Sequence, residues 1–491
     1  MNVYAEDHSL FNQYLGVQAA GRERRAQSLT PAGETSLQDI LTSRRMELYW
    51  PLLWERMLSW VASDYPLAAV APGTLPKQVR QDALCRALEE LIRLGPALYE
   101  TYPLLEHYDR LVCDGASRFF DEVFTTLEEQ REAISDTFFG GRDFGKITAA
   151  RLPNAINSGS RPGFRMTLLL EAEGGRFYFK PRVCTAEKLY DALMERFFPE
   201  VGTSCKTVIG PRASFTESVQ KAPLASGEEA KAYFTRLGAM SAIFYALQTG
   251  DMHSSNVIPM GPYPVPIDLE CLLPVWWAGV PYAPPDIEML SFLRKKKNGY
   301  NSPLYVEPGN VRARQNLCQL SGRPVTVLDE PEAFLAGFKD AYRRIMESAG
   351  EWVFMIEAHP EVPLRMLLRS HRTSGSILRG LLEPAQLRSA KARDAWLERV
   401  WAAIPESWRS QVREMEREDF LNLDFPELCL HIGESSVRRT DGTVVLENAV
   451  LPPAQYAKLR FASLSEQELQ KALEGLKSYL AVIRACEEEY S

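Results

Sequence analysis

The chain has 491 residues, of which 64 are acidic and 56 basic, so its formal net charge is −8. Hydrophobic residues make up 45% and charged residues 24%, which are ordinary proportions for a globular protein and exclude global disorder and collagen-like structure. The acidic balance argues against a general nucleic-acid binder, because neutralising phosphates requires a basic face, although it leaves room for a local basic patch.

The first 146 residues are predicted to form a helical region. Residues 1–35 are polar and without clear periodicity, whereas apolar residues recur at helical spacing from Ser36 to about Phe139. The segment FFGGRDFGK (138–146) contains three glycines and ends this pattern. Within it, Asp143-Phe144-Gly145 matches the magnesium-binding triplet of protein kinases. The triplet precedes the other candidate site residues, which is the wrong order for a kinase, so we interpret it as a turn.

Short strands are predicted next. Residues 165–182 contain two apolar runs around Glu173-Gly174-Gly175, which is a hairpin signal. The spacing predicts a helix over Ala186–Phe198, and residues 205–222 look extended. This part of the chain therefore mixes strands with helix.

The remaining chain is predicted to be mostly helical. A long helix rich in Ala, Leu, Tyr and Phe is expected over Gly227–Gln248, and two short strands around a Gly/Pro turn over residues 257–273. From about Ala283 onward we expect helices with polar loops, ending in an amphipathic helix over Ser465–Glu489. The overall expectation is an α+β protein.

Cysteine and histidine usage argues against disulfides and zinc. The eight cysteines contain no CxxC pair, and the six histidines show no zinc-ligand spacing. A chain this long can build its core without disulfides, so we expect reduced thiols and a cytoplasmic location. The first residues lack the features of a signal peptide and no apolar run reaches transmembrane length, so we expect no membrane partner.

The strongest candidate for a catalytic site is a pair of polar segments, Gly250–Asn256 and Pro266–Glu270. Asp251 and Asn256 follow the long helix in a loop, and Asp268 ends a short apolar strand. Phosphoryl transfer requires a carboxylate that orients the hydroxyl, together with an amide oxygen and a second carboxylate that hold Mg²⁺. We therefore predict that these three side chains converge on one metal–phosphate site.

A lysine on an upstream strand would be expected to bind phosphate in such a site. Lys180 follows aromatic residues in Arg176-Phe-Tyr-Phe-Lys180, and Asp191 and Glu195 on the next helix are alternative partners for it. A single lysine on a strand is usually a solvent-exposed residue, but the ordered set favours catalysis. The segment Asn157–Gly163 resembles a phosphate-binding loop, and we weigh that interpretation against a plain surface turn.

Several short motifs occur in a fixed order along the chain. They are Tyr102–Leu105, Phe138–Gly140, Phe179-Lys180-Pro181-Arg182, Gly250–Ile258, Ile267–Glu270, residues 428–451 and Ser463–Leu469. In this order they resemble the motifs of the dehydratase domain of class II lanthipeptide synthetases, the LanM family, including its YKPR, DxHxEN and IDLET signatures. The resemblance covers most of the chain.

The resemblance implies a two-lobed catalytic core similar to that of lipid kinases. Residues 1–146 would be an N-terminal helical region and residues 147–223 the N-lobe, with a hairpin, a helix and strands. Residues 224–491 would be the C-lobe, with the catalytic loop and additional C-terminal helices.

The family phosphorylates Ser and Thr of a ribosomal precursor peptide with ATP and Mg²⁺ and then eliminates the phosphate to leave dehydroamino acids. The resemblance implies roles for individual residues. Asp251 would be the catalytic base, His253 would steady the phosphoryl group, and Asn256 and Asp268 would hold Mg²⁺. The ATP-binding residues would be Lys180, Arg182 and either Asp191 or Glu195.

Two departures from the family pattern limit the expected activity. The chain ends where the dehydratase domain would end, so we expect no cyclase zinc site and no formation of thioether rings. The family's Asp-x-His before the first hairpin strand is replaced by Asn157–Gly163, which lacks both residues. Kinase activity is therefore better supported than elimination.

A third departure concerns the family's Arg/Thr motif. It corresponds here to the segment from Arg365 to Thr373, and the Thr position falls on either His371 or Thr373. Arg365, Arg369 and Arg372 could supply cations for a departing phosphate, and His371 could supply a base for elimination. A basic, solvated helix end is an equally good interpretation.

Three functions stay open. The first is a LanM-like peptide kinase, with or without elimination, acting on the leader and core of a precursor peptide and working with a separate lyase or cyclase. The second is a kinase of a small-molecule or lipid-like alcohol. The third is a non-catalytic partner, against which the joint retention of Lys180, Asp251, Asn256 and Asp268 argues. The large helical region suits leader-peptide binding, and a purely structural scaffold is the alternative.

Overall fold

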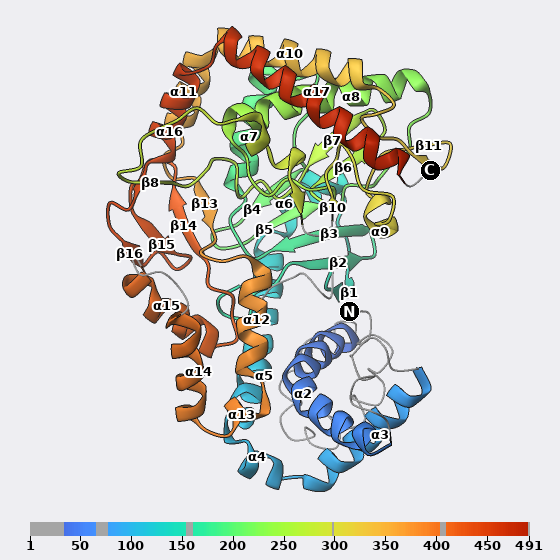
Figure 1. Cartoon of the computed structure of the whole chain (residues 1–491), viewed down its shortest axis with the longest axis vertical. Coiled ribbons are helices and arrows are strands. Elements are labelled where there is room, and N and C mark those ends of the chain that lie inside the picture. The colour runs from blue at the N-terminus through green and yellow to red at the C-terminus, as the bar shows by residue number, and fades with distance from the viewer. Residues whose placement is uncertain (1–33, 65–76, 154–160, 297–298, 403–408, 490–491) are drawn as a thin grey trace. The chain divides into compact units, whose positions relative to one another are not determined.

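The computed structural model describes residues 34–64, 77–153, 161–296, 299–402 and 409–489. Its helices and strands confirm the expected α+β class (Figure 1). The chain divides into two compact units, each built from two separate stretches. Unit 1 comprises Met1–Pro181 and Leu367–Glu427, and unit 2 comprises Arg182–Met366 and Leu428–Ser491. The expected boundaries at residues 146 and 223 stay a prediction.

Unit 1 is mainly helical. Its described helices are α2 (Glu34–Asp64), α3 (Lys77–Leu94), α4 (Ala97–Thr101), α5 (Pro103–Glu129), α6 (Arg131–Phe139), α12 (His371–Leu381), α13 (Pro384–Leu387), α14 (Ala390–Ala402) and α15 (Arg409–Leu421). The helical prediction from Ser36 to Phe139 is thus confirmed for the described residues. The apolar faces of α2, α3 and α5 form one buried core, to which the second stretch contributes Leu382 and Leu387.

Three antiparallel strands complete unit 1: β1 (Ile147–Arg151), β2 (Leu168–Ala172) and β3 (Gly175–Lys180). β2 and β3 form the predicted hairpin, with Leu168 opposite Phe179. Phe177 and Phe179 are buried, whereas Tyr178 and Lys180 are half-buried, which is the alternation of a strand with one face in the core. Lys180 therefore lies on the face opposite the buried phenylalanines.

The helices of unit 2 are α7 (Thr185–Phe197), α8 (Gly227–Leu247), the 3₁₀ helices η3 (Ile287–Met289) and η4 (Ser291–Leu293), α9 (Val311–Arg314), α10 (Pro331–Glu347), α11 (Ala349–Glu357), α16 (Pro453–Ala462) and α17 (Glu466–Glu488). The longest buried stretch among them is in α8, which packs mainly against α10. Ser226 is the N-cap of α8, and its side chain accepts a hydrogen bond from Glu229 N; all of Leu237–Leu247 is buried. α10 packs against both α8 and α17 (Figure 1).

The strands of unit 2 are short. They are β4 (Thr207–Ile209), β5 (Ser214–Glu217), β6 (Val257–Met260), β7 (Tyr263–Pro266), β8 (Trp276–Trp277), β9 (Lys295–Lys296), β10 (Gly299–Tyr300), β11 (Gln319–Leu320), β12 (Arg323–Pro324), β13 (Pro363–Met366), β14 (Leu428–His431), β15 (Val437–Arg439), β16 (Val444–Leu446) and β17 (Val450–Leu451). The two strands predicted over residues 257–273 form the β6–β7 pair, and the segment predicted to be extended over residues 205–222 contains β4 and β5, which also pair. Beyond residue 283, however, helices and loops were expected, and β13, β14, β15 and β16 form an antiparallel sheet.

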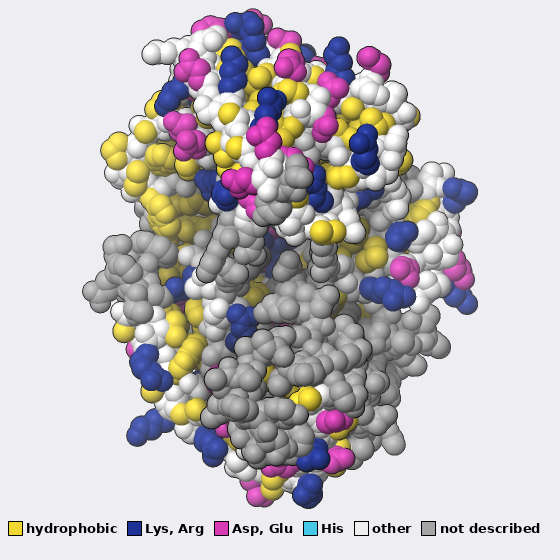
Figure 2. Space-filling view, turned by 45° about the vertical axis from the view of Figure 1, so that its right-hand side comes forward, with side chains coloured by type: hydrophobic (Ala, Val, Ile, Leu, Met, Phe, Trp, Pro, Cys, Tyr) yellow, Lys and Arg dark blue, Asp and Glu magenta, His cyan; other side chains and the backbone are white. Residues whose placement is uncertain are grey.

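Two surface features bear on the expected partners. None of the described helices combines the length and apolar composition needed to cross a membrane. On the face shown in Figure 2, basic and acidic side chains are interspersed over the described elements.

Candidate functional site

The candidate site lies where two loops of unit 2 run side by side. We call residues 249–256, which follow α8, the Asp251 loop, and residues 267–272, which follow β7, the Asp268 loop. Ile267 N donates to Asn256 O (2.9 Å), and Gly250 N donates to Cys271 O (2.9 Å). These bonds continue the β6–β7 hairpin, in which Val257 pairs with Pro266. The loops thus bring Asp251, Asn256 and Asp268 to the open end of one hairpin.

Both candidate acids have an unusual backbone conformation. Asp251 has φ 53° and Asp268 has φ 58°, the left-handed region that non-glycine residues adopt uncommonly, although Asp tolerates it better than most. The residue that ends α8, Gln248, is also left-handed, and the chain turns there toward the Asp251 loop. Backbone strain of this kind tends to be retained at functional sites.

Asn256 fixes the shape of the Asp251 loop from inside. Its side chain is buried, and its Nδ2 donates to Asp251 O (2.9 Å), while its backbone N donates to His253 O (2.9 Å). Because Nδ2 donates this bond, the amide nitrogen of Asn256 faces the Asp251 carbonyl and the amide oxygen Oδ1 points away from it. No described residue donates a hydrogen bond to this Oδ1, and Asp251 itself is exposed.

Residues from outside the sequence motifs support the same loop. Ser254 Oγ donates to Asn301 Oδ1 (2.5 Å), and Asn316 Nδ2 donates to Ser255 Oγ (3.0 Å). Ser255 N donates to His253 Nδ1 (3.2 Å), so the neutral imidazole carries its proton on Nε2. Asn301 and Asn316 were not found from the sequence, because they lie 45 or more residues further along the chain and belong to no recognisable motif.

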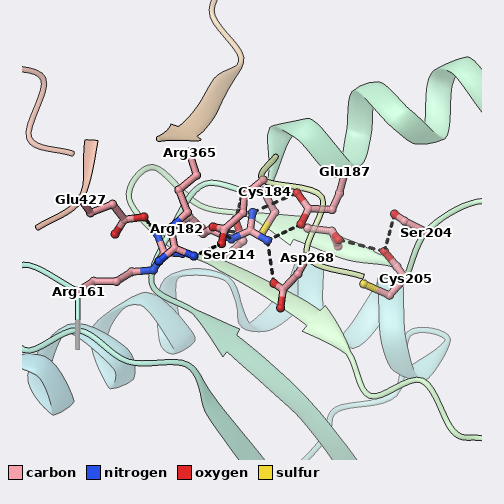
Figure 3. A network of polar contacts seen from close by, with 12 residues as sticks. Arg161, Arg182, Cys184, Glu187, Ser204, Cys205, Ser214, Asp268, Arg365 and Glu427 are labelled. Carbon is pink, nitrogen blue, oxygen red and sulfur yellow. Dashed lines mark hydrogen bonds and ion pairs between the residues drawn. The ribbon is translucent and has the colours of Figure 1, made fainter. Parts of the chain in front are cut away.

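Asp268 belongs to a network of charged side chains centred on Arg182 (Figure 3). Arg182 Nη2 lies 2.5 Å from Glu187 Oε1 and 3.1 Å from Asp268 Oδ1, and Nη1 lies 3.2 Å from Glu187 Oε2. Its Nε lies 3.1 Å from Glu270 Oε2. Burial alone would lower the pKa of Arg182, but the neighbouring Cys184, Glu187 and Glu270 outweigh it and raise this pKa well above its usual value.

Glu270 joins a second arginine to this network. Arg365 Nη1 lies 2.5 Å from Glu270 Oε1, and Arg365 N donates to Glu270 O (2.8 Å). Arg365 is on β13, so a predicted elimination residue and the Asp268 loop are held together within unit 2. Both side chains are largely buried.

The acids predicted to pair with Lys180 have other surroundings. Asp191 Oδ1 accepts a hydrogen bond from Ser204 N (2.7 Å), and burial raises the pKa of this carboxyl. Glu195 is exposed on α7. The buried acid of α7 is Glu187, which the sequence analysis did not select. Because Lys180 belongs to unit 1, its partner acid stays a prediction.

The Asn256 amide and the Asp268 carboxylate suit magnesium better than a metal that is coordinated by protein side chains alone. Among the described residues no three His, Cys, Asp or Glu side chains are grouped so that they could hold a metal ion. Mg²⁺ is commonly bound by one or two carboxylates and completed by waters and substrate phosphates. An amide oxygen from Asn256 and a carboxylate from Asp268 fit that pattern.

The other predicted elimination residues lie in unit 1. Arg369 forms a bidentate pair with the buried Glu416 (2.7 and 2.9 Å), which also accepts from Trp401 Nε1 (3.3 Å). Thr373 N donates to Ser370 Oγ (3.2 Å) at the start of α12. The same helix begins with His371 and Arg372, whose side chains lie outside the described part of the structure.

The loop before the β2–β3 hairpin is tied to acidic residues of its own unit. Residues 157–160 lie outside the described ranges. Arg161 Nη1 lies 2.6 Å from Glu427 Oε1 (Figure 3), and Asp424 accepts from Gly163 N (2.7 Å) and Phe164 N (3.2 Å). The Asp143 triplet lies in the loop between α6 and β1, where Asp143 Oδ1 accepts from Gly145 N (2.9 Å).

Comparison with known proteins places the chain in a family. The family described as a domain of unknown function (DUF4135) matches residues 102–305 and 293–428. The lacticin 481/lactococcin biosynthesis protein LcnDR2 of Lactococcus lactis subsp. lactis is 29% identical over 109 residues. This second match covers 20% of the chain and 12% of LcnDR2, so the chain spans only a small part of that relative. Because the first match runs over more than half of the chain, including both loops of the candidate site, the chain belongs to the DUF4135 family.

Proposed function

We propose that this chain is a kinase that transfers the γ-phosphoryl group of ATP to Ser or Thr side chains of a ribosomal precursor peptide. The observation that carries the proposal is the convergence of Asp251, Asn256 and Asp268 at the open end of the β6–β7 hairpin. One exposed carboxylate, one buried amide and one further carboxylate are the side chains that phosphoryl transfer uses.

The peptide substrate is supported by the comparison with LcnDR2, whose name describes a role in the biosynthesis of lacticin 481 and lactococcin. Since that likeness covers a small part of LcnDR2, the substrate class is inferred from it together with the site. A small-molecule or lipid-like alcohol is the second candidate, and the experiment below separates the two.

Each residue of the site has a distinct task in this proposal. The Asp251 carboxylate accepts the proton of the substrate hydroxyl. As that proton leaves, the hydroxyl oxygen of the substrate bonds to the γ-phosphorus of ATP, and the bond between this phosphorus and the ADP oxygen breaks. His253, with its proton on Nε2, donates a hydrogen bond to the transferring group. Asn256 and Asp268 would hold Mg²⁺, which would neutralise charge on the phosphate oxygens. The phosphate-binding role of Lys180 stays a prediction.

The proposal is tested by mass spectrometry of a candidate precursor peptide incubated with the protein, ATP and Mg²⁺. The wild-type chain is expected to add one phosphoryl mass, and Asp251→Asn is expected to lower the rate about 10²–10⁴-fold, the usual contribution of a general base. Asp143→Asn is the matched control, because it makes the same change in an exposed turn of unit 1 and should leave the rate unchanged.

The outcomes separate the candidate functions. A phosphorylated peptide supports the kinase proposal, and a net loss of water shows that elimination follows the transfer. Nucleotide binding without modification of any peptide favours the small-molecule substrate. Equal activity of Asp251→Asn and wild type would contradict the assignment of Asp251.

A further inference from the structure

The carboxylate of Asp268 is held by a guanidinium that is itself fixed in place. The Arg182 side chain is 10% exposed and gives two of its nitrogens to Glu187, whose side chain is 1% exposed. Breaking a buried pair of this kind leaves an uncompensated buried charge and is strongly disfavoured. Arg182 is therefore poorly placed to leave this pair and bind a nucleotide phosphate, which is the role that the sequence motif implied.

Asp268 is the member of the network that faces outward. Its side chain is 34% exposed, compared with 13% for Glu270 and 1% for Glu187. Arg182 reaches Asp268 Oδ1 through Nη2, the same nitrogen that binds Glu187 Oε1. Arg182 therefore links the Asp268 carboxylate to the buried Glu187.

The two buried acids of the network each use both carboxylate oxygens. Glu187 pairs with Arg182 through both of them, and Glu270 contacts Arg182 with one and Arg365 with the other. The carboxylate that meets solvent is Asp268, and its left-handed backbone must be kept in place by its surroundings.

We propose that Arg182 and Glu187 are positioning residues that orient Asp268 toward a divalent cation and so set the affinity of the site for that cation. The proposal rests on the function proposed above, because it takes Asp268 as a cation ligand. It assigns to α7 a task at the metal site, through Glu187, without contact with the nucleotide.

The test measures binding and needs no turnover. Mn²⁺ serves as the probe, and its free concentration is followed by electron paramagnetic resonance in the presence of the full chain and the non-hydrolysable analogue adenylyl imidodiphosphate. A parallel calorimetric titration measures binding of the same analogue in EDTA, without metal. A residue that binds the nucleotide phosphates affects the affinity for the analogue in EDTA. A residue that only positions a metal ligand affects the affinity for Mn²⁺.

Two single variants are expected to behave alike. Arg182→Lys keeps the positive charge but loses the planar guanidinium, whose three nitrogens contact Glu187, Asp268 and Glu270. Glu187→Gln loses the bidentate ion pair with Arg182. Each should weaken Mn²⁺ binding about 10- to 100-fold, as is usual when a partner of a metal ligand is changed. Metal-free binding of the analogue should not change. Combining the two should cost less than the product of the single effects, because both act through one contact.

Two further variants guard against misfolding. The double variant Arg182→Gln/Glu187→Gln removes both charges of the pair, so no buried charge is left unpaired, and it should still bind Mn²⁺ weakly. Arg45→Lys is the matched control, because Arg45 forms an equally buried bidentate pair with Asp109 in unit 1. It should bind Mn²⁺ as the wild type does.

Each outcome decides one question. Parallel loss of Mn²⁺ affinity in Arg182→Lys and Glu187→Gln supports the positioning role. Unchanged Mn²⁺ affinity in Glu187→Gln, or weaker metal-free binding of the analogue in Arg182→Lys, overturns it and leaves the proposed function standing. A wild-type chain that binds no analogue at all overturns both proposals.

Discussion

At the scale of single residues, Asp251 shows how chemistry and backbone shape can require the same side chain. Its carboxylate is exposed, its carbonyl accepts from Asn256 Nδ2, and its φ is 53°. Asp and Asn adopt the left-handed region more readily than other residues with a Cβ, because their short polar side chains can form local hydrogen bonds. Different substitutions at this position can therefore separate the two roles, because asparagine removes the carboxylate but keeps the preference for positive φ, whereas alanine removes both.

Asp251→Asn should therefore lower the rate about 10²–10⁴-fold while keeping the loop stable. Asp251→Ala should lower the rate by a similar factor but should unfold more easily than Asp251→Asn, by about 1 kcal/mol, because alanine is strained at positive φ. Thermal unfolding of the two variants side by side measures the difference. Equal midpoints would show that the loop relaxes out of the left-handed conformation.

At the scale of elements, the position of the Asp251 loop depends on the packing of α8 against α10. A Cβ added to Gly238 would lie 2.1 Å from Phe334 O, and a Cβ added to Gly337 would lie 2.0 Å from Thr235 O. Both clashes involve backbone atoms, so no side chain can move to relieve them. The two glycines allow the helices to approach this closely, and α8 carries the loop at its end.

Gly238→Ala should destabilise the protein by about 1–3 kcal/mol, although alanine is the better helix former, because the helices must move apart. Gly350→Ala in α11 is the control, since a Cβ there meets nothing within 4 Å, and its effect should stay within about 0.5 kcal/mol. Denaturant unfolding of both variants is the measurement. An unchanged stability of Gly238→Ala would show that this contact is looser than described.

The elements also show what local sequence can and cannot reveal. The β2–β3 hairpin was predicted because its turn glycines are neighbours in sequence, and α8 because its apolar residues are continuous. The sheet of β13–β16 was not, because β13 pairs with β14 some 60 residues away and each strand has only three or four residues. Such pairings depend on contacts between distant segments, which periodicity does not reveal.

The candidate site shows the same contrast between residues that lie close together in sequence and contacts that depend on other segments. Asp251, Asn256 and Asp268 lie in two motifs close together in sequence, so their convergence could be expected, and the loops do run side by side. Glu187 was missed, although a signal existed. It falls at helical spacing with the apolar residues Tyr190 and Met194 on the buried face of α7, a position where an acid needs a partner.

At the scale of the whole molecule, both units are interrupted in sequence. Each begins before residue 367 and is completed by a segment after it. In unit 2, β13 pairs with β14, α11 packs against α16 and α10 packs against α17, so the later segment supplies partners to three earlier elements. Any contiguous fragment that contains all of unit 1 therefore also contains residues 182–366 of unit 2. Any contiguous fragment that contains all of unit 2 also contains residues 367–427 of unit 1.

A fragment comprising residues 182–366 should therefore fail to fold. It lacks β14, α16 and α17 and would expose the apolar faces that they cover. Circular dichroism should show no cooperative thermal transition for this fragment. A chain shortened only to end at Glu489 retains α17 and should melt as the full chain does, whereas a cooperative transition in the fragment would contradict the nested arrangement.

The core of the N-terminal helices has a consequence for the order in which the protein forms during synthesis. Leu382 and Leu387 belong to the same buried cluster as α2, α3 and α5, yet they are translated about 200 residues after the first stretch of unit 1 ends. At 5–20 residues per second this delay is roughly 10–40 s. Throughout that interval the nascent chain presents an incompletely covered apolar face outside the ribosome, and chaperones that bind such faces would meet it there.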